Sequence, residues 1–152
     1  MKTLANAGDR AALLQRLNAI RPDSPRRWGK MSAHEMVCHL GDAFRMATGE
    51  KAVSPATSVL QRTLVKWTAL YAPLPWPPGI LTRPEIEQGL GGTCPGDFAS
   101  DVAAVATILD AFARRDGSVE WPPHPIFGPL SRKAWLRWGY LHTDHHLRQF
   151  GL

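Results

Sequence analysis

Four long stretches of the chain repeat apolar residues at helical spacing, and nowhere do apolar and polar residues alternate as in a strand. The first stretch runs from about Asp9 to Ile20, with Asp9 as its expected cap. Arg21-Pro22 ends it, because proline cannot continue a helix. The pattern therefore predicts an all-α protein.

The second stretch begins with a capping box, in which Ser32 and Glu35 satisfy each other's backbone N–H groups. Helical rotation turns His39 at least partly inward, at one edge of the apolar stripe. It places His34 nearly opposite the stripe, so we expect His34 to be solvated. The stripe itself consists of Met36, Leu40, Ala43 and Ala47.

The middle of the chain is the least regular part. A short apolar pattern from Val59 to Tyr71 predicts a helix that the prolines after residue 72 end. Residues 73–96 are rich in Gly and Pro, and a loop of that length is more often the lid or wall of a site than a passive connector. Another helix is predicted from Asp97 to Arg115, with Gly117 as a candidate C-cap.

The last stretch begins at Ser131, a good N-cap, after a proline-fixed segment that brings His124 and Phe127 near its start. At 100° per residue, two histidines four residues apart fall in the middle of its inner face. That face comprises Trp135, Trp138, Gly139, His142, His146 and Gln149. The opposite face comprises Lys133, Arg137, Tyr140, Asp144 and Arg148.

Four principal helices with one long connection indicate a four-helix bundle, with an irregular crossover between the second and third main helices. We expect residues 1–152 to form a single domain, long enough for a core of its own. Facing helices in a bundle bring side chains to one point. His39 is therefore the expected partner of His142 and His146.

The histidines of the last helix have two interpretations. A single inward histidine is usually a core residue with one hydrogen-bond partner. The pair His142 and His146 stacks about 5–6 Å apart at Cβ, the spacing at which two imidazoles share one metal ion. Three histidines suit Zn²⁺ or Ni²⁺ and leave a coordination position open. His145 lies about 80° from the centre of the face and is expected to flank the site.

Composition narrows the possible partners. The formal net charge is +5, but the basic residues are scattered, which disfavours a dedicated nucleic-acid surface. Cys38 and Cys94 form neither a disulfide framework nor a CxxC pair, so a reducing, cytoplasmic setting is expected. No apolar run approaches the length of a membrane span, and we expect no membrane partner.

Three motifs carry a family resemblance: WGKMSAHEMVCHL, HPIFGPLSRKAW and the terminal HTDHHLRQFGL. With them the chain resembles the DinB/YfiT-like superfamily of metal-dependent proteins, and within it a branch of unknown function. The resemblance implies a DinB-like four-helix bundle, a divalent metal on His39, His142 and His146, and frequently a homodimer. Characterised relatives include thiol-dependent transferases and isomerases, in which the metal activates a small thiol cofactor.

Two classes of function follow. The first is a metal-dependent transferase or hydrolase, in which the ion on the three histidines activates a water or a small thiol. The second is a non-catalytic module that binds metal or associates with nucleic acid, suggested by the charge and the sequence KAWLRW. Glu35 and Asp42 are not expected to coordinate, although either could orient a histidine. Arg148 falls on the solvent face, and the substrate stays unidentified.

Overall fold

The computed structural model describes residues 1–80, 82–116 and 119–152, and this part of the chain is helical. It contains no strand, and one isolated antiparallel bridge joins His124 to Gly128. The prediction of an all-α fold is confirmed. The α-helices are α1 (Ala7–Asn18), α2 (Ala33–Thr48), α3 (Lys66–Tyr71), α4 (Phe98–Arg114) and α5 (Arg132–Gln149). Two short turns complete them, the π-helical η1 (Gln61–Val65) and the 3₁₀ η2 (Pro84–Ile86).

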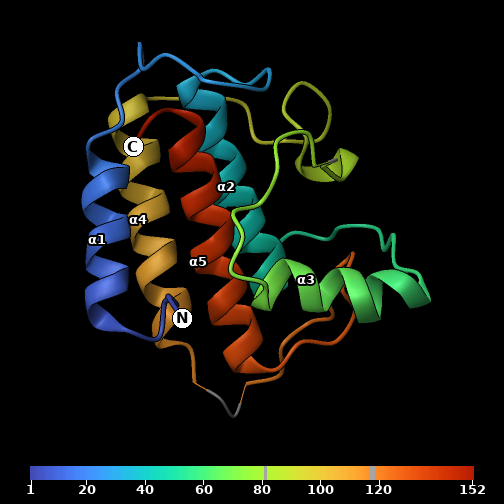
Figure 1. The fold of residues 1–152 in the computed structure, drawn as a ribbon. Helices are drawn as coiled ribbons and strands as arrows, with labels where there is room; N and C mark the ends of the chain where they lie inside the picture. Colours follow the sequence, from blue (N-terminus) through green and yellow to red (C-terminus); the bar gives the residue numbers. More distant parts are fainter. Residues whose placement is uncertain (81, 117–118) are drawn as a thin grey trace.

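The four long helices α1, α2, α4 and α5 run side by side, and α3 lies across the lower end of α5 (Figure 1). Helix α5 contacts each of the other four, while α2 packs along α4. The crossover from α2 to α4 carries η1, α3 and η2. None of the helices in the described ranges is long and apolar enough to span a membrane.

Polar N-cap residues mark the starts of the long helices, because their side chains accept from free backbone N–H groups of the first turn. The Ser32 side chain accepts from the Glu35 N–H, and Glu35 accepts from the Ser32 N–H at 2.7 Å, which confirms the capping box. Ser131 caps α5 as predicted, and Asp97, where the next helix was expected to start, caps α4. Helix α4 ends at Arg114, and Gly117 lies outside the described residues.

The predicted start of α1 was wrong. Asn6 is the cap, and its side chain accepts from the Asp9 N–H at 2.9 Å. The Asp9 carboxylate instead accepts from the Thr3 N–H at 2.9 Å, which ties the N-terminal segment to the first turn of α1. Asp9 is thus a first-turn acid rather than a cap, and both positions suit the positive end of a helix.

Helix α5 is buried on more sides than an amphipathic helix would be. Its predicted inner face is buried except for His142, which is half-buried, and Leu136, Tyr140 and Leu147 are buried as well. The expectation that Tyr140 faces solvent was wrong, because α1 and α3 cover the sides of α5 that α2 and α4 leave open. The helix that carries two of the candidate ligands is therefore the centre of the bundle.

The predicted helix in the crossover exists as η1 followed by α3, but its apolar residues lie mostly at the surface. Leu70 is fully buried, whereas Leu64 and Trp67 are each 61% exposed. Helix α3 anchors to α5 through the Arg137 guanidinium, which donates to the Leu70 carbonyl at 3.0 Å.

A buried carboxylate fixes the end of the crossover to α2. Asp42 has no exposed surface and accepts from the Thr93 N–H at 2.7 Å, the Thr93 hydroxyl at 2.6 Å and Lys51 at 2.9 Å. Burial alone would raise the pKa of Asp42, but these hydrogen bonds outweigh it and lower the pKa. Asp42 is buried because the loop before α4 folds over it.

Gly139 permits the close approach of α5 to its neighbours. A Cβ at this position would lie 2.8 Å from Leu4 Cδ1 and 3.2 Å from both Phe44 Cε1 and Phe112 Cε1. These atoms come from the N-terminal segment, α2 and α4, and the residues that hold them are fully or almost fully buried. A methyl group there has little room in a densely packed core.

We expect Gly139→Ala to lower the free energy of unfolding by about 1–3 kcal/mol, because the added methyl overpacks the core. Urea denaturation followed by circular dichroism measures the change. The matched control is Gly41→Ala in α2, where the nearest atom is the flexible end of Arg45 at 3.2 Å. Gly41→Ala should be neutral or stabilise by up to about 1 kcal/mol through helix propensity. Equal effects of the two changes would contradict this account of α5 packing.

Candidate metal centre

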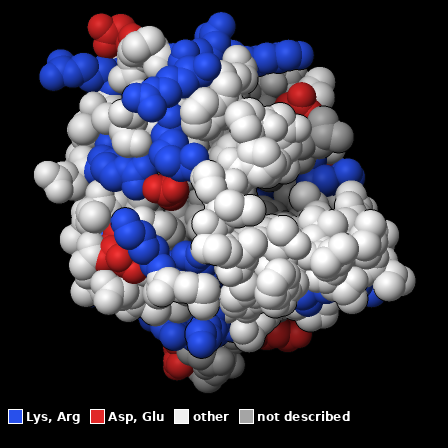
Figure 2. Space-filling model, viewed as in Figure 1, with Lys and Arg blue, Asp and Glu red and all other residues white. Residues whose placement is uncertain are grey.

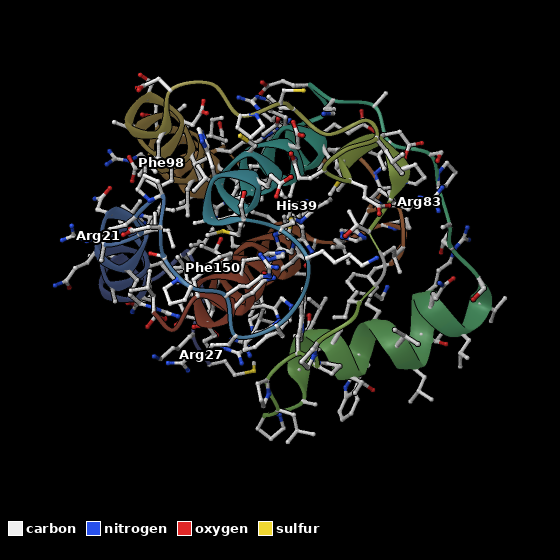
Figure 3. The ribbon with its side chains drawn as sticks, turned by 90° about the horizontal axis from the view of Figure 1, so that it is seen from above. Arg21, Arg27, His39, Arg83, Phe98 and Phe150 are labelled. Carbon is white, nitrogen blue, oxygen red and sulfur yellow. The ribbon has the colours of Figure 1, made fainter. Side chains whose placement is uncertain are left out.

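His39 of α2 meets His142 and His146 of α5 in the interior. One ring nitrogen of each lies within 4.8 Å of the others. The ring centroids are 5.3 Å apart for His39 and His142, 4.8 Å for His39 and His146, and 4.7 Å for His142 and His146. Figure 3 shows His39 on the side of α2 that faces α5. Helical rotation thus predicted the residues that the fold brings together.

A backbone carbonyl orients His39. Its Nδ1 lies 3.0 Å from the Ile86 carbonyl oxygen, at the end of η2. A carbonyl oxygen only accepts, so Nδ1 carries the proton and the Nε2 lone pair is left free. Metal-bound histidines commonly donate their other nitrogen to such an oxygen, which fixes both tautomer and ring orientation.

His146 is oriented by a relay of two hydrogen bonds. The Gln149 side-chain amide donates from Nε2 to the Trp28 carbonyl at 2.9 Å, which fixes its orientation. Its Oε1 therefore faces His146 Nδ1 at 3.0 Å and accepts from it. Gly29 is required beside this relay, because its φ is +78° and a Cβ there would lie 2.5 Å from Gln149 Nε2. His146 thus also presents an unprotonated Nε2.

His142 is held by packing. Its ring stacks on Trp138 at a centroid distance of 5.0 Å and an interplanar angle of 12°. Its Nδ1 is buried and has no hydrogen-bond partner among the described residues. An unpaired buried polar nitrogen is costly in a folded protein, and it commonly marks a water or an ion that completes the site.

Burial keeps the three imidazoles neutral. Desolvation lowers the pKa of His39 and holds the pKa of His142 and His146 well below the usual range. The mutual proximity of the rings lowers the pKa of His142 and His146 further, since two charged rings would repel. A neutral imidazole is the form that binds metal. The set therefore has the chemistry of a three-histidine ligand group.

Two carboxylates that could have oriented His39 have other roles. Glu35 accepts from the Ser32 N–H in the capping box, and Asp42 holds Thr93 and Lys51. The residue that orients His39 is Ile86, which sequence reasoning missed. A backbone carbonyl has no residue signature, and its position depends on how the crossover folds back onto α2.

His145 flanks the three histidines, as predicted. It is 6% exposed, and its ring lies 5.2 Å from His146, 5.9 Å from Trp28 and 6.1 Å from Trp76. Its Nδ1 is buried without a hydrogen-bond partner in the described ranges. Desolvation lowers the pKa of His145 too, so this ring adds a polar neutral group beside the centre.

A second cluster lies between α2 and α4 and was not predicted. His34 Nε2 is 2.7 Å from Asp101 Oδ2, which also accepts from the Gly96 N–H at 3.0 Å and from Cys38 Sγ at 3.7 Å. The expectation that His34 is solvated was wrong, because Asp101 lies directly opposite it on α4. Burial first, and then the Asp101 charge, raise the pKa of Cys38 to about 11.

The raised pKa keeps Cys38 a thiol at neutral pH, whereas metal binding requires the thiolate. Asp101 already accepts hydrogen bonds from His34, Gly96 and Cys38. Although His34, Cys38 and Asp101 have the donor atoms of a metal site, they are satisfied as a hydrogen-bonded cluster. The three-histidine group is the better candidate.

A pocket of about 590 Å³ opens onto the three histidines. The crossover forms much of its wall through Trp76, Ile80 and Ile86, which agrees with the expectation that residues 73–96 border the site. Figure 2 shows a hollow on this face surrounded mostly by uncharged residues, while Lys and Arg gather largely on the other half of the view. Such a volume is typical of small-molecule sites.

The two tryptophans of the sequence KAWLRW lie in the core. Trp135 and Trp138 are buried, so neither offers a stacking platform for bases. Arg148 pairs with Asp144 at 2.9 Å and does not line the pocket. The Asp144 carboxylate also forms an ion pair with Arg16 of α1 at 2.6 Å, and this ion pair joins α1 to α5.

The comparisons with known proteins give a family and no activity. A family model described as "Protein of unknown function (DUF1569)" matches residues 48–151. The match includes His124, His142 and His146 and begins after His39. No curated protein and no solved structure matches the chain. Because the matched segment spans more than half of the 152 residues, the chain belongs to this family of proteins of unknown function.

Proposed function

We propose that the protein is a metal-dependent enzyme of the DinB/YfiT-like type, a transferase or hydrolase with a divalent ion on His39, His142 and His146. The observation that carries the proposal is the geometry of these rings. Their ligand atoms lie within 4.8 Å of one another in the interior of the bundle. A core histidine that serves packing alone needs no such convergence.

The donor set fits an ion in three ways. His39 and His146 donate from Nδ1 to oxygen atoms, which leaves each Nε2 lone pair available. The Nδ1 atom of His142 is buried without a partner in the described part of the chain. All three rings are neutral, as ligation requires. Three imidazoles favour Zn²⁺ or Ni²⁺ over Mg²⁺ or Ca²⁺, which prefer oxygen ligands.

A divalent ion on neutral ligands supplies Lewis acidity, which lowers the pKa of a water or thiol that it coordinates. The chain's own residues have three tasks. His39, His142 and His146 provide the donor atoms, and Ile86 and Gln149 hold two of the rings in the correct tautomer. Trp76 and the rest of the crossover wall limit the access of water from one side.

The pocket favours catalysis over a structural role. Structural zinc sites normally fill four positions with protein groups, whereas catalytic sites keep one position open. Three histidines converge here, and the pocket reaches all three of them. The alternative of a nucleic-acid-associated module has less support, because Trp135 and Trp138 lie in the core.

The nucleophile is proposed to be a water or a small thiol. The resemblance to thiol-dependent transferases favours the thiol, and the pocket volume accommodates either. Those relatives commonly carry the form HxxxHRGQ, whereas this chain has Leu147-Arg148-Gln149 after His146. Gln149 has a defined task here, because it orients His146.

Metal binding is the first test. We expect protein purified without a nickel column to bind one Zn²⁺ per chain in isothermal titration calorimetry. His142→Ala or His146→Ala should abolish this binding, because two imidazoles seldom hold the ion alone. The matched control is His34→Ala, which removes a histidine of the second cluster and should leave the affinity unchanged. Loss of binding in His34→Ala with retention in His39→Ala would place the ion at Asp101 instead.

An open coordination position is the second test. We expect Co²⁺-loaded protein to change its visible spectrum when azide or a small thiol is added, because the added ligand occupies the free position. The control is the same titration of Co²⁺ in buffer without protein. A spectrum that stays constant through every addition would indicate a closed, structural site and would argue against the enzyme.

A further inference from the structure

The wall of the pocket has a definite chemistry. Apolar side chains from α2, η1, α3, the crossover and the connection between α4 and α5 dominate it, among them Met46, Leu64, Ala69, Trp76, Ile80 and Phe127. Of the described residues that line the pocket, Arg83 alone has a permanent charge. Its guanidinium donates to the Ser54 carbonyl at 3.1 Å and to the Ser54 hydroxyl at 2.6 Å, so it is engaged by the crossover itself. Figure 3 shows Arg83 farther from α5 than His39 is.

His124 is a polar group of the pocket that the proposed metal chemistry does not use. Its Nδ1 accepts from the Ile126 N–H at 3.1 Å and from the Phe127 N–H at 3.2 Å. A nitrogen that accepts two N–H groups carries no proton, so the ring's proton is on Nε2. Backbone bonds between His124 and Gly128, at 2.9 and 2.8 Å, hold the turn that sets this arrangement.

The surroundings of His124 keep it neutral and rigid. Burial lowers the pKa of His124 to about 3. The ring stacks on Phe127 at 4.6 Å and packs against Trp135 and Trp138 at 5.3 and 5.4 Å. Trp138 in turn stacks on His142, so His124 lies one aromatic ring away from the three histidines. A neutral imidazole in this tautomer is a hydrogen-bond donor with a fixed position.

We propose that the pocket takes a predominantly apolar, uncharged small molecule with one carbonyl oxygen, and that His124 Nε2–H binds this oxygen. The inference rests on the proposed function, since it names the substrate class of the same site. Transfer of an apolar ligand from water into this apolar pocket is favourable. A charged ligand would lose its hydration and find no free counter-charge among the described residues of the pocket. Two backbone N–H groups fix the ring of His124, so its Nε2–H selects for an acceptor oxygen at one place in a largely apolar pocket.

The test uses 2-acetonaphthone as the ketone probe and 2-isopropylnaphthalene as a hydrocarbon of similar shape, each in equilibrium dialysis. Glutathione serves as the charged, polar probe, and it is measured with a chelator present so that its thiol has no metal ion to bind. We expect the ketone to bind about 3–10-fold tighter than the hydrocarbon, as one hydrogen bond predicts. Glutathione should not compete with either. Equal binding of ketone and hydrocarbon, or stronger binding of glutathione, would overturn the proposal.

Two variants locate the binding. In His124→Asn, the Asn Oδ1 replaces Nδ1 as the acceptor of the Ile126 and Phe127 N–H groups, as in Asx turns. The Asn side chain is too short to replace the Nε2–H donor. The substitution should therefore abolish the preference for the ketone and leave hydrocarbon binding unchanged. Ala69→Trp should weaken both probes by about 10-fold or more by filling the pocket. Its matched control, Ala104→Trp on the exposed side of α4, should weaken neither.

If His124→Asn fails to fold by circular dichroism, nitrogen NMR of histidine-labelled parent protein decides the role of His124. The ketone, and not the hydrocarbon, should shift a ring signal with a protonated Nε2 and an unprotonated Nδ1. The absence of such a shift would overturn the assignment of His124 as the donor.

Dialysis of the two naphthalene probes is carried out both with Zn²⁺ and with a chelator. Absence of probe binding in both conditions would overturn the substrate class alone, whereas absence of Zn²⁺ binding in calorimetry would overturn the proposed function.

Discussion

Three imidazole rings lie in the interior of the bundle, and the folded chain has to keep each of them neutral and oriented. Desolvation suppresses their charge, and oxygen atoms of Ile86 and Gln149 accept hydrogen bonds from the Nδ1–H groups of His39 and His146. Both oxygen atoms depend on irregular segments. Ile86 belongs to the crossover, and Gln149 is itself held by Trp28 in the connection between α1 and α2. The loops therefore position the candidate site as much as the helices do.

The central place of α5 follows from the same constraint. A helix that carries two inward histidines needs neighbours on every side to exclude water, and α1, α2, α3 and α4 all contact it. Gly139 allows this by admitting Leu4, Phe44 and Phe112 to its backbone. The pocket is lined by α5 together with η1, α3 and the crossover, so the segments that cover α5 also form the wall around the histidines.

Helical periodicity predicted the parts of the structure that depend on rotation about one axis. It placed His39, His142 and His146 inward, because each lies on a long, well-capped helix. Tertiary partners could not be predicted in this way. Asp101 meets His34 from another helix, and Ile86 reaches His39 from a loop whose path no periodicity describes. Tyr140 was misplaced because rotation alone does not reveal that a helix has neighbours on all sides.

The central claim is that one ion binds His39, His142 and His146 and no other group of side chains. X-ray absorption at the zinc edge of the protein loaded with one Zn²⁺ per chain tests it most directly, because the spectrum identifies the coordinating atoms. We expect three imidazole nitrogens at about 2.0–2.1 Å and one further light atom, without sulfur. A sulfur neighbour at about 2.3 Å would place the ion at Cys38, His34 and Asp101 and would contradict the account.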